Sequence, residues 1–234
     1  RGKSMTYLMK LELKKISLKR YCFISVGLIL FSILFITISL IDSATDPAQS
    51  KDTFDNIFLM IEVLLSFIYI VFFGVLVSSI IIKEYNTKTI LIMFSYPIQK
   101  AKLILAKLFL ISIFISLSML IGFFACCGYT VIVDYLLDLL AGNFELTYLI
   151  NWLFSIITTI LVCICLGGLT FCLGMLKKSV PFTIVGSIFF IFLRQVALSS
   201  PFGYAENLLQ VLIIVIFSCL CIRYIVKTKL SCVE

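Results

Sequence analysis

The sequence contains no histidine, only four prolines and few charged residues. Without an imidazole, the chain has no histidine general base, no histidine metal ligand and no Ser-His or Cys-His nucleophile pair. Charged residues make up 13% of the 234 residues and hydrophobic residues 62%, whereas soluble domains average about 25% charged and about 45–50% apolar. Too little charge is present to build a water-soluble surface. The composition therefore indicates an integral membrane protein.

Long apolar runs divide the chain into six predicted membrane-spanning helices. A helix needs about 20 apolar residues to cross the hydrocarbon core. The predicted spans are 21–41, 57–82, 103–127, 148–176, 180–193 and 208–226. The fifth is short, and residues 194–207 after it are only moderately hydrophobic, so we predict a re-entrant or surface-lying outer segment there. The expected fold is all-α, with a single transmembrane domain over residues 1–234.

The positive charges orient these spans. Of the 19 lysines and arginines, 17 lie in the N-terminal segment, 83–102, 177–179 and the tail, together with Lys107 just inside the third span. The opposite side keeps only Lys51 and Arg194, and it holds most of the carboxylates: Asp42, Asp46, Asp52, Asp55, Asp134, Asp138, Glu145 and Glu206. This bias predicts that both termini are cytoplasmic. It also accounts for the net charge of +7 without a nucleic-acid partner.

Residues 5–20 precede the first span and follow a basic amphipathic pattern. Met5, Met9 and Leu13 form one helical stripe, and lysines lie on the opposite side. The pattern predicts an interfacial helix on the inner leaflet, with its lysines toward anionic lipid headgroups. A basic flank that only orients the first span is the alternative. Four residues, RGKS, stand before Met5, and we expect the natural start at Met5.

The spacing of some cysteines and of two aspartates is similar to that of metal or cation sites, but neither set predicts such a site. Most of the nine cysteines lie in apolar runs, so no disulfide framework is implied. Cys163/Cys165 and Cys219/Cys221 are better explained as small packing residues than as metal ligands. Asp134 and Asp138 lie one helical turn apart after the third span. An amphipathic outer helix that exposes both carboxylates explains them better than a cation or basic-peptide site. We expect no catalytic residue, no metal and no cofactor bound by this chain.

Residues 83–97, between the second and third spans, combine charge with a short apolar face. After the polar opening at Lys83, the residues Ile90, Leu91 and Phe94 give about two turns of apolar helix. Pro97 ends this helix because the residue before a proline is driven out of the α region. An exposed apolar side of this kind indicates a docking surface for a partner. An ordinary inner loop that packs on its own helix ends is the alternative.

At this segment the sequence resembles the type-2 ABC exporter permeases. The resemblance rests on Glu84, Thr89, Ile90, Pro97, Ile98, Lys100 and Lys107, and on the layout of an inner-leaflet helix, six spans and a re-entrant excursion before the last span. It implies that the segment is a coupling helix docked on an ATP-binding subunit. The coupling residues would then be Lys83, Glu84, Tyr85, Thr87, Thr89, Ile90, Leu91, Phe94 and Pro97. Two ATP-binding subunits carrying ATP and Mg²⁺, and a second permease, identical or paralogous, are implied as partners beside membrane lipid.

The small size and short loops most resemble permeases that export peptide antibiotics or confer immunity to lantibiotics and bacitracin-like compounds. This likeness implies a bacterial cell-membrane exporter of an antimicrobial peptide or another amphipathic, lipid-like compound. The chain has no glycine-rich phosphate-binding loop, so ATP would be hydrolysed on the separate subunit. The alternatives are a stand-alone secondary transporter or channel, which usually carries mid-membrane charges or broken repeats, and an intramembrane enzyme.

Two ionisable residues near span ends are candidates for a transport pathway or an ion pair. Glu62 lies a short way into the second span, where an unpaired charge costs a few kcal/mol. Its alternative role is a carboxylate that reaches the outer headgroups. Arg194 ends the predicted fifth span and is its candidate partner.

Three glycines of the fourth span are candidates for close helix packing: Gly167, Gly168 and Gly174. Small residues spaced along one helix face let another helix backbone approach closely. Such a contact would lie either inside the subunit or at a dimer seam, and internal packing is the more usual outcome.

Overall fold

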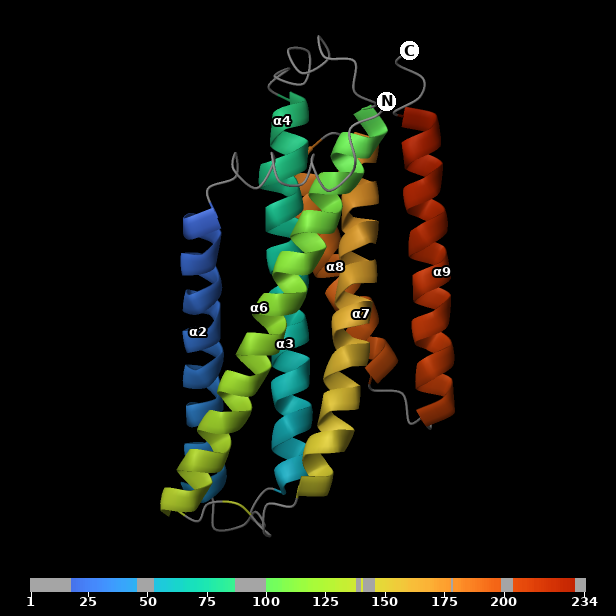
Figure 1. Ribbon diagram of the computed structural model, residues 1–234. Helices are drawn as coiled ribbons and strands as arrows, with labels where there is room; N and C mark the ends of the chain where they lie inside the picture. Colours follow the sequence, from blue (N-terminus) through green and yellow to red (C-terminus); the bar gives the residue numbers. More distant parts are fainter. Residues whose placement is uncertain are drawn as a thin grey trace. The chain divides into compact units, whose positions relative to one another are not determined.

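The computed structural model describes residues 18–45, 53–86, 100–137, 140, 146–177, 179–198 and 204–229, and its elements there are all helical (Figure 1). The helices are α2 (Leu18–Thr45), α3 (Phe54–Val77), the π-helix η1 (Ser78–Ile82), α4 (Lys83–Asn86), α6 (Lys100–Leu137), α7 (Leu146–Lys177), α8 (Val180–Leu198) and α9 (Tyr204–Lys229). The prediction of an all-helical chain is confirmed.

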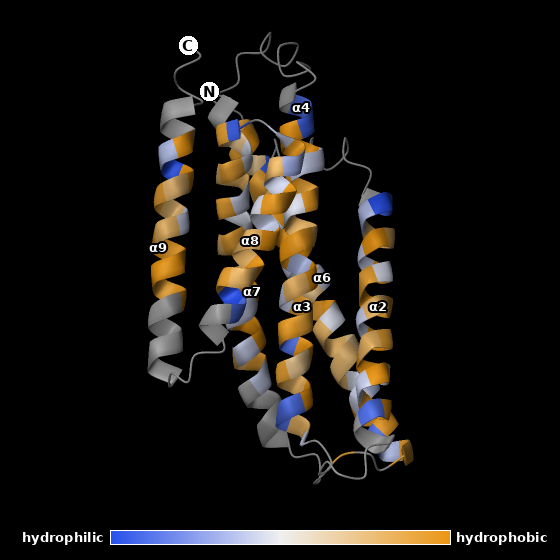
Figure 2. Ribbon diagram, turned by 180° about the vertical axis from the view of Figure 1, so that it is seen from behind, coloured by the Kyte–Doolittle hydropathy of each residue, from blue (hydrophilic) through white to orange (hydrophobic). Residues whose placement is uncertain are grey.

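Four of these helices are long and apolar enough to cross a membrane: Lys19–Asp42, Phe54–Ile82, Leu103–Leu137 and Trp152–Lys177. Val180–Gln195 and Val211–Ile225 are shorter apolar helices. Hydrophobic residues cover most of the described helix lengths, and hydrophilic ones gather toward several helix ends (Figure 2). The chain is therefore an integral membrane protein built of helices.

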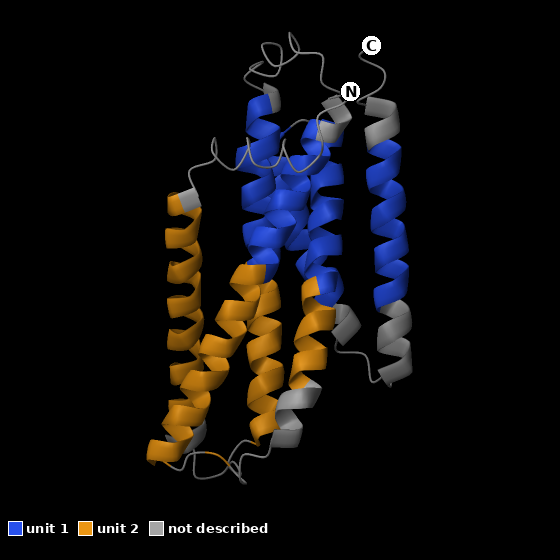
Figure 3. Cartoon of the chain, in the orientation of Figure 1, with its two compact units in different colours: residues 1–18, 69–116, 161–234 blue, residues 19–68, 117–160 orange. Residues whose placement is uncertain are grey.

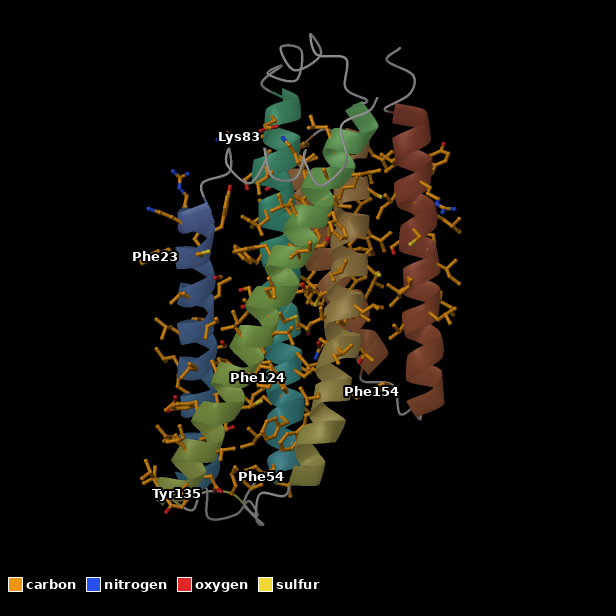
Figure 4. The ribbon with its side chains drawn as sticks, in the orientation of Figure 1. Phe23, Phe54, Lys83, Phe124, Tyr135 and Phe154 are labelled. Carbon is orange, nitrogen blue, oxygen red and sulfur yellow. The ribbon has the colours of Figure 1, made fainter. Side chains whose placement is uncertain are left out.

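The helices differ in how far the protein itself covers them. In the most apolar window of α3, 78% of the residues are buried, against 22% for α2, so α3 is an interior helix and α2 a peripheral one. Large apolar side chains such as Phe23, Phe124 and Phe154 are exposed, as is Tyr135 near the end of α6 (Figure 4). Lipid is the natural surrounding for such apolar faces.

The chain divides into two compact units, coloured separately in Figure 3. Unit 1 comprises residues 1–18, 69–116 and 161–234, and unit 2 comprises residues 19–68 and 117–160. Each unit takes part of α3, α6 and α7, so each has its own interior.

In unit 2, polar contacts connect α2 to its neighbours. The hydroxyls of Thr37 and Tyr129 lie 2.8 Å apart, and the Ser39 hydroxyl donates to the Met60 sulfur on α3 at 3.3 Å. Thr37 already donates to the Ile33 carbonyl of its own helix, so Tyr129 is the donor in the contact between α2 and α6. In a bilayer, an apolar helix face gains little by packing on another helix instead of on lipid. These hydrogen bonds therefore help to specify where α2 packs.

A double-mutant cycle of Thr37→Val and Tyr129→Phe is expected to give a small positive coupling. Interhelical hydrogen bonds in membranes average about 0.6 kcal/mol because the unfolded chain also finds partners in the bilayer. The free energy of unfolding in mixed micelles would be measured for both single variants and the double variant. Strict additivity of the two single effects would contradict this hydrogen bond.

In unit 1, α8 begins where its sequence favours a helix start. Pro181 occupies the first turn, where its missing N–H is not needed. The Ser179 carbonyl accepts from both the backbone N–H and the hydroxyl of Thr183, at 3.2 and 3.0 Å. The helix that begins here is in contact with η1.

Two helix ends differ from the sequence-based expectation. We expected the third span to end at Cys127, but α6 continues to Leu137 and includes Asp134. Between Cys127 and Leu137 the only glycine or proline is Gly128, and a lone glycine costs about 1 kcal/mol in a helix without stopping it. The aspartate is therefore part of the same long helix rather than of a separate outer one, and its Oδ1 accepts from the Leu140 N–H at 2.9 Å.

The fifth apolar segment is also longer than expected. Arg194 does not end it, because α8 continues to Leu198, and the next helix-breaking residue is Pro201. Of the predicted re-entrant range, residues 194–198 belong to α8 and residues 204–207 to α9; the remainder lies outside the described residues. The predicted interfacial helix 5–20 lies outside them too, apart from its last three residues, which open α2.

Candidate functional site

The end of α3 passes directly into a tightly packed π turn. In η1 the Lys83 N–H donates to the Ser78 carbonyl, five residues back, which is the hydrogen-bond pattern of a π-helix. Ser78, Ile80, Ile81 and Ile82 are buried there. Such π turns are rare in proteins, and many of those that occur lie at functional sites. The segment 83–97 therefore starts from a fixed point rather than from a loose helix end.

Glu84 forms an ion pair with Lys107 immediately after this turn. The Lys107 ammonium donates to the Glu84 carboxylate, joining α4 to the second turn of α6 within unit 1. Lys107 is only 3% exposed and Glu84 27%. A buried charge needs a counter-charge, and removing one partner of a buried pair costs about 3–5 kcal/mol. The sequence identified both residues but did not predict their pairing.

The other predicted coupling residues are described only in part. Lys83 is exposed at the helix end and is labelled in Figure 4, and Tyr85 lies in α4. The rest lie outside the described residues: Thr87, Thr89, Ile90, Leu91, Phe94 and Pro97. The role assigned to these residues stays a prediction.

Glu62 lies on α3 in unit 2, and two hydroxyls of α7 hold its carboxylate. Ser155 donates to one carboxylate oxygen and Thr159 to the other. The two donors are four residues apart, so they share one face of α7. One turn before Glu62 on α3, the ring of Phe58 stacks on that of Trp152 with a 3.3 Å centroid separation. Aromatic and polar contacts together fix α7 against α3 in this unit.

Thr159→Val is expected to destabilise the protein by about 1–2 kcal/mol, since it removes one of the two hydroxyl donors of the part-buried Glu62 side-chain contact. The matched control is Thr158→Val, because the Thr158 hydroxyl donates to the Ser155 carbonyl of its own helix at 2.7 Å. Unfolding in mixed micelles would be followed for both variants. If the two valine variants lose the same stability, the contact with Glu62 contributes nothing beyond the general effect of removing a hydroxyl.

Arg194, the candidate partner of Glu62, lies in α8 and is partly buried. It belongs to unit 1, whereas Glu62 belongs to unit 2. Their pairing stays a prediction. The sequence did not predict that Ser155 and Thr159 donate to Glu62. The one signal for this contact was their spacing of four residues on an apolar helix.

The three glycines of α7 each face another helix of unit 1. A Cβ on Gly167 would overlap the Phe73 ring on α3, and one on Gly168 would lie 2.9 Å from Ile222 Cδ1 on α9. A Cβ on Gly174 would lie 2.5 Å from Thr183 Oγ1 and 3.0 Å from Ile82 Cδ1. These distances are shorter than ordinary van der Waals contact, so the missing side chains are what let the helices approach.

Gly74 has the same role on α3, although the sequence did not single it out. A Cβ there would lie 2.7 Å from the Cβ and Oγ of Ser187 on α8. Small residues on both sides therefore bring α3 and α8 together just before η1. Within the described ranges, no group of three or more His, Cys, Asp or Glu residues is placed to hold a metal ion.

The helices and their apolar faces define a multi-pass membrane protein. The chain matches the family model described as ABC-2 family transporter protein over residues 8–194, and it belongs to that family. Over 104 residues it is 34% identical to a Bacillus subtilis (strain 168) protein named "Uncharacterized protein YcbO", covering 43% of this chain and 44% of the relative. The match thus spans less than half of that relative. No solved structure matches the chain.

Membership in this family assigns a general role. The family comprises membrane subunits of transporters that are not themselves catalytic, and they normally work with an ABC ATP-binding subunit. The predicted resemblance to type-2 ABC permeases is thereby confirmed at the level of the family.

Proposed function

We propose that this chain is the permease subunit of an ATP-driven ABC exporter. The observation that carries the proposal is the family match over residues 8–194, in a chain whose helices can span a membrane. ATP and Mg²⁺ are bound on two copies of a separate ATP-binding subunit, because the chain has no phosphate-binding loop of its own. A second permease, identical or paralogous, completes the transporter.

The proposed topology has six spans with both termini in the cytoplasm. Support comes from the lysines and arginines, most of which lie on one side of the apolar runs. This topology places an interfacial helix at 5–20 and the coupling segment 83–97 on the cytoplasmic side, and a re-entrant segment at 194–207 on the outer side. The protein resides in the bacterial cell membrane.

The proposed mechanism is a mechanical transfer from the ATP-binding subunits to the spans. The apolar side of the coupling segment docks on the ATP-binding subunit, and nucleotide-driven movement displaces the segment. Packed helices then shift as rigid bodies. The ion pair at Glu84 and the buried π turn before it support this mechanism, because they attach the segment to two spans.

The proposed cargo is an antimicrobial peptide or another amphipathic, lipid-like compound moved out of the membrane or cell. Support comes from the short connections between the apolar runs, which resemble those of small peptide-exporting permeases. Co-expression with the ATP-binding subunit is expected to raise the inhibitory concentration of bacitracin-like or lantibiotic peptides in a sensitive host. Unchanged sensitivity across such a panel would remove this cargo class.

Gentle-detergent purification from native membranes tests the permease assignment. We expect stoichiometric recovery of an ABC ATP-binding subunit, identified by mass spectrometry, and its loss when residues 84–94 are replaced. Recovery of the permease alone, under conditions that keep other ABC complexes intact, would favour a stand-alone secondary transporter or channel.

A further inference from the structure

The Glu84–Lys107 ion pair connects the two ends of the connection between α3 and α6. Glu84 is the second residue of α4, which follows η1 without a break, and Lys107 lies two turns into α6. Both residues belong to unit 1. The pair therefore fixes the start of the segment 83–97 to the helix into which that segment leads.

The two partners of the ion pair differ in burial, and this difference determines which of them depends on the other. Lys107 is 3% exposed and Glu84 27%. An exposed ion pair contributes little because water and salt screen it. An ammonium withdrawn from water instead depends on its carboxylate, and the flexible lysine stem is held in place by its surroundings. Lys107 is thus an interior anchor for a carboxylate at the edge of the protein.

The turn that precedes Glu84 is buried among its neighbours. Ile82 is fully buried, and its Cδ1 lies next to Gly174 of α7, while α8 contacts η1. Close-packed interiors transmit displacement because they have little room to deform. A displacement applied after Glu84 is therefore passed on to α3 and, through Lys107, to α6.

We propose that Lys107 is a positioning residue for ATP-driven transport, which acts through Glu84 to make the coupling segment and α6 move together. The inference rests on the proposed function and deepens it. It assigns the Glu84 carboxylate to a contact inside the permease rather than to docking on the ATP-binding subunit. Nothing in the sequence pattern distinguished these two roles.

The test uses the complex of this chain with its ATP-binding subunit in lipid nanodiscs. The rate of MgATP hydrolysis by the isolated ATP-binding subunit is subtracted from that of the complex, which gives the permease-dependent increment. Five variants are compared: Glu84→Gln, Lys107→Met, both together, Glu84→Lys alone, and the charge exchange Glu84→Lys with Lys107→Glu. Lys177→Met is the control, since Lys177 is an exposed lysine that lies over the Phe182 ring at 4.2 Å.

We expect each single variant to lower the increment about tenfold, with the double variant no worse, because residues that act as one unit are not additive. The amount of ATP-binding subunit recovered with each variant should stay at the wild-type level. The charge exchange should return the increment to within about threefold of wild type, because it restores the ion pair. Loss of the increment at unchanged recovery of the ATP-binding subunit is what separates a positioning role from a purely structural one. Lys177→Met should behave as wild type.

The inference is overturned if Lys107→Met keeps the wild-type increment, or if the charge exchange is as inactive as Glu84→Lys alone. Should Lys107→Met fail to assemble, the comparison of the charge exchange with Glu84→Lys decides by itself. A wild-type chain that recovers no ATP-binding subunit is a different result. It removes the proposed function, and this inference with it, before any variant is made.

Discussion

Replacing Gly167 with leucine is expected to prevent accumulation of the folded protein. A Cβ at this position would overlap the ring of Phe73, which is fully buried on α3. Extra methylene groups in a packed interior cost about 1–3 kcal/mol or more, and a leucine adds a whole branched side chain. Folded yield would be measured as the monodisperse fraction after detergent extraction, together with the midpoint of thermal unfolding.

Gly27→Leu is the matched control for this variant. No atom lies within 4 Å of a Cβ built on Gly27, which is exposed on α2, so the same substitution should change stability by no more than about 0.5 kcal/mol. Adding Phe73→Ala to Gly167→Leu should recover part of the folded yield by vacating the ring's space. If both leucine variants fold equally well, the contact between α7 and α3 is not as close as described.

The variant Ile90→Glu is expected to abolish permease-dependent ATP hydrolysis while leaving the protein in the membrane. Ile90 is central to the apolar side of the segment 83–97. If that side docks on the ATP-binding subunit, a carboxylate there is buried without a partner, which costs several kcal/mol. A loss of that size separates the subunits. Co-purification and ATP hydrolysis in nanodiscs would both be measured.

Gln99→Glu is the control, because it adds the same charge beyond Pro97, where no apolar face is predicted. It should leave hydrolysis unchanged. Membrane insertion of both variants is checked by their recovery in the membrane fraction. If Ile90→Glu retains the wild-type rate, the apolar side of this segment does not dock, and the interpretation as an ordinary inner loop is favoured.

The helices were predictable from the sequence because a membrane leaves few alternatives. Every backbone group in the hydrocarbon core must be hydrogen-bonded internally, so a long apolar run becomes a helix. The ends were less predictable. Hydrophobicity decides where a helix leaves the membrane, not where it stops, and α6 therefore continues past Cys127 to Leu137.

Pairings between helices were not predictable, because they depend on how each helix is rotated about its axis. The sequence singled out Glu62 and Glu84 as functional candidates, but it assigned neither of them the partner that the structure gives: Ser155 and Thr159 for the former, Lys107 for the latter. Lipid-facing and inward-facing residues are both apolar here. Amphipathic periodicity, which orients the helices of a soluble protein, is therefore largely lost.

The π turn at Ser78–Ile82 has a consequence for how related chains align. A turn closed by a bond to the fifth residue back holds about one residue more than an α-helical turn. The extra residue is taken up locally, so the direction of Glu84 follows the helices that it contacts rather than the number of residues before it. A relative with one residue fewer between Val77 and Lys83 could form an uninterrupted α-helix and still present its glutamate to α6. We therefore expect single-residue gaps in alignments of this family to fall at 78–82, where the length of the chain can change without loss of the ion pair.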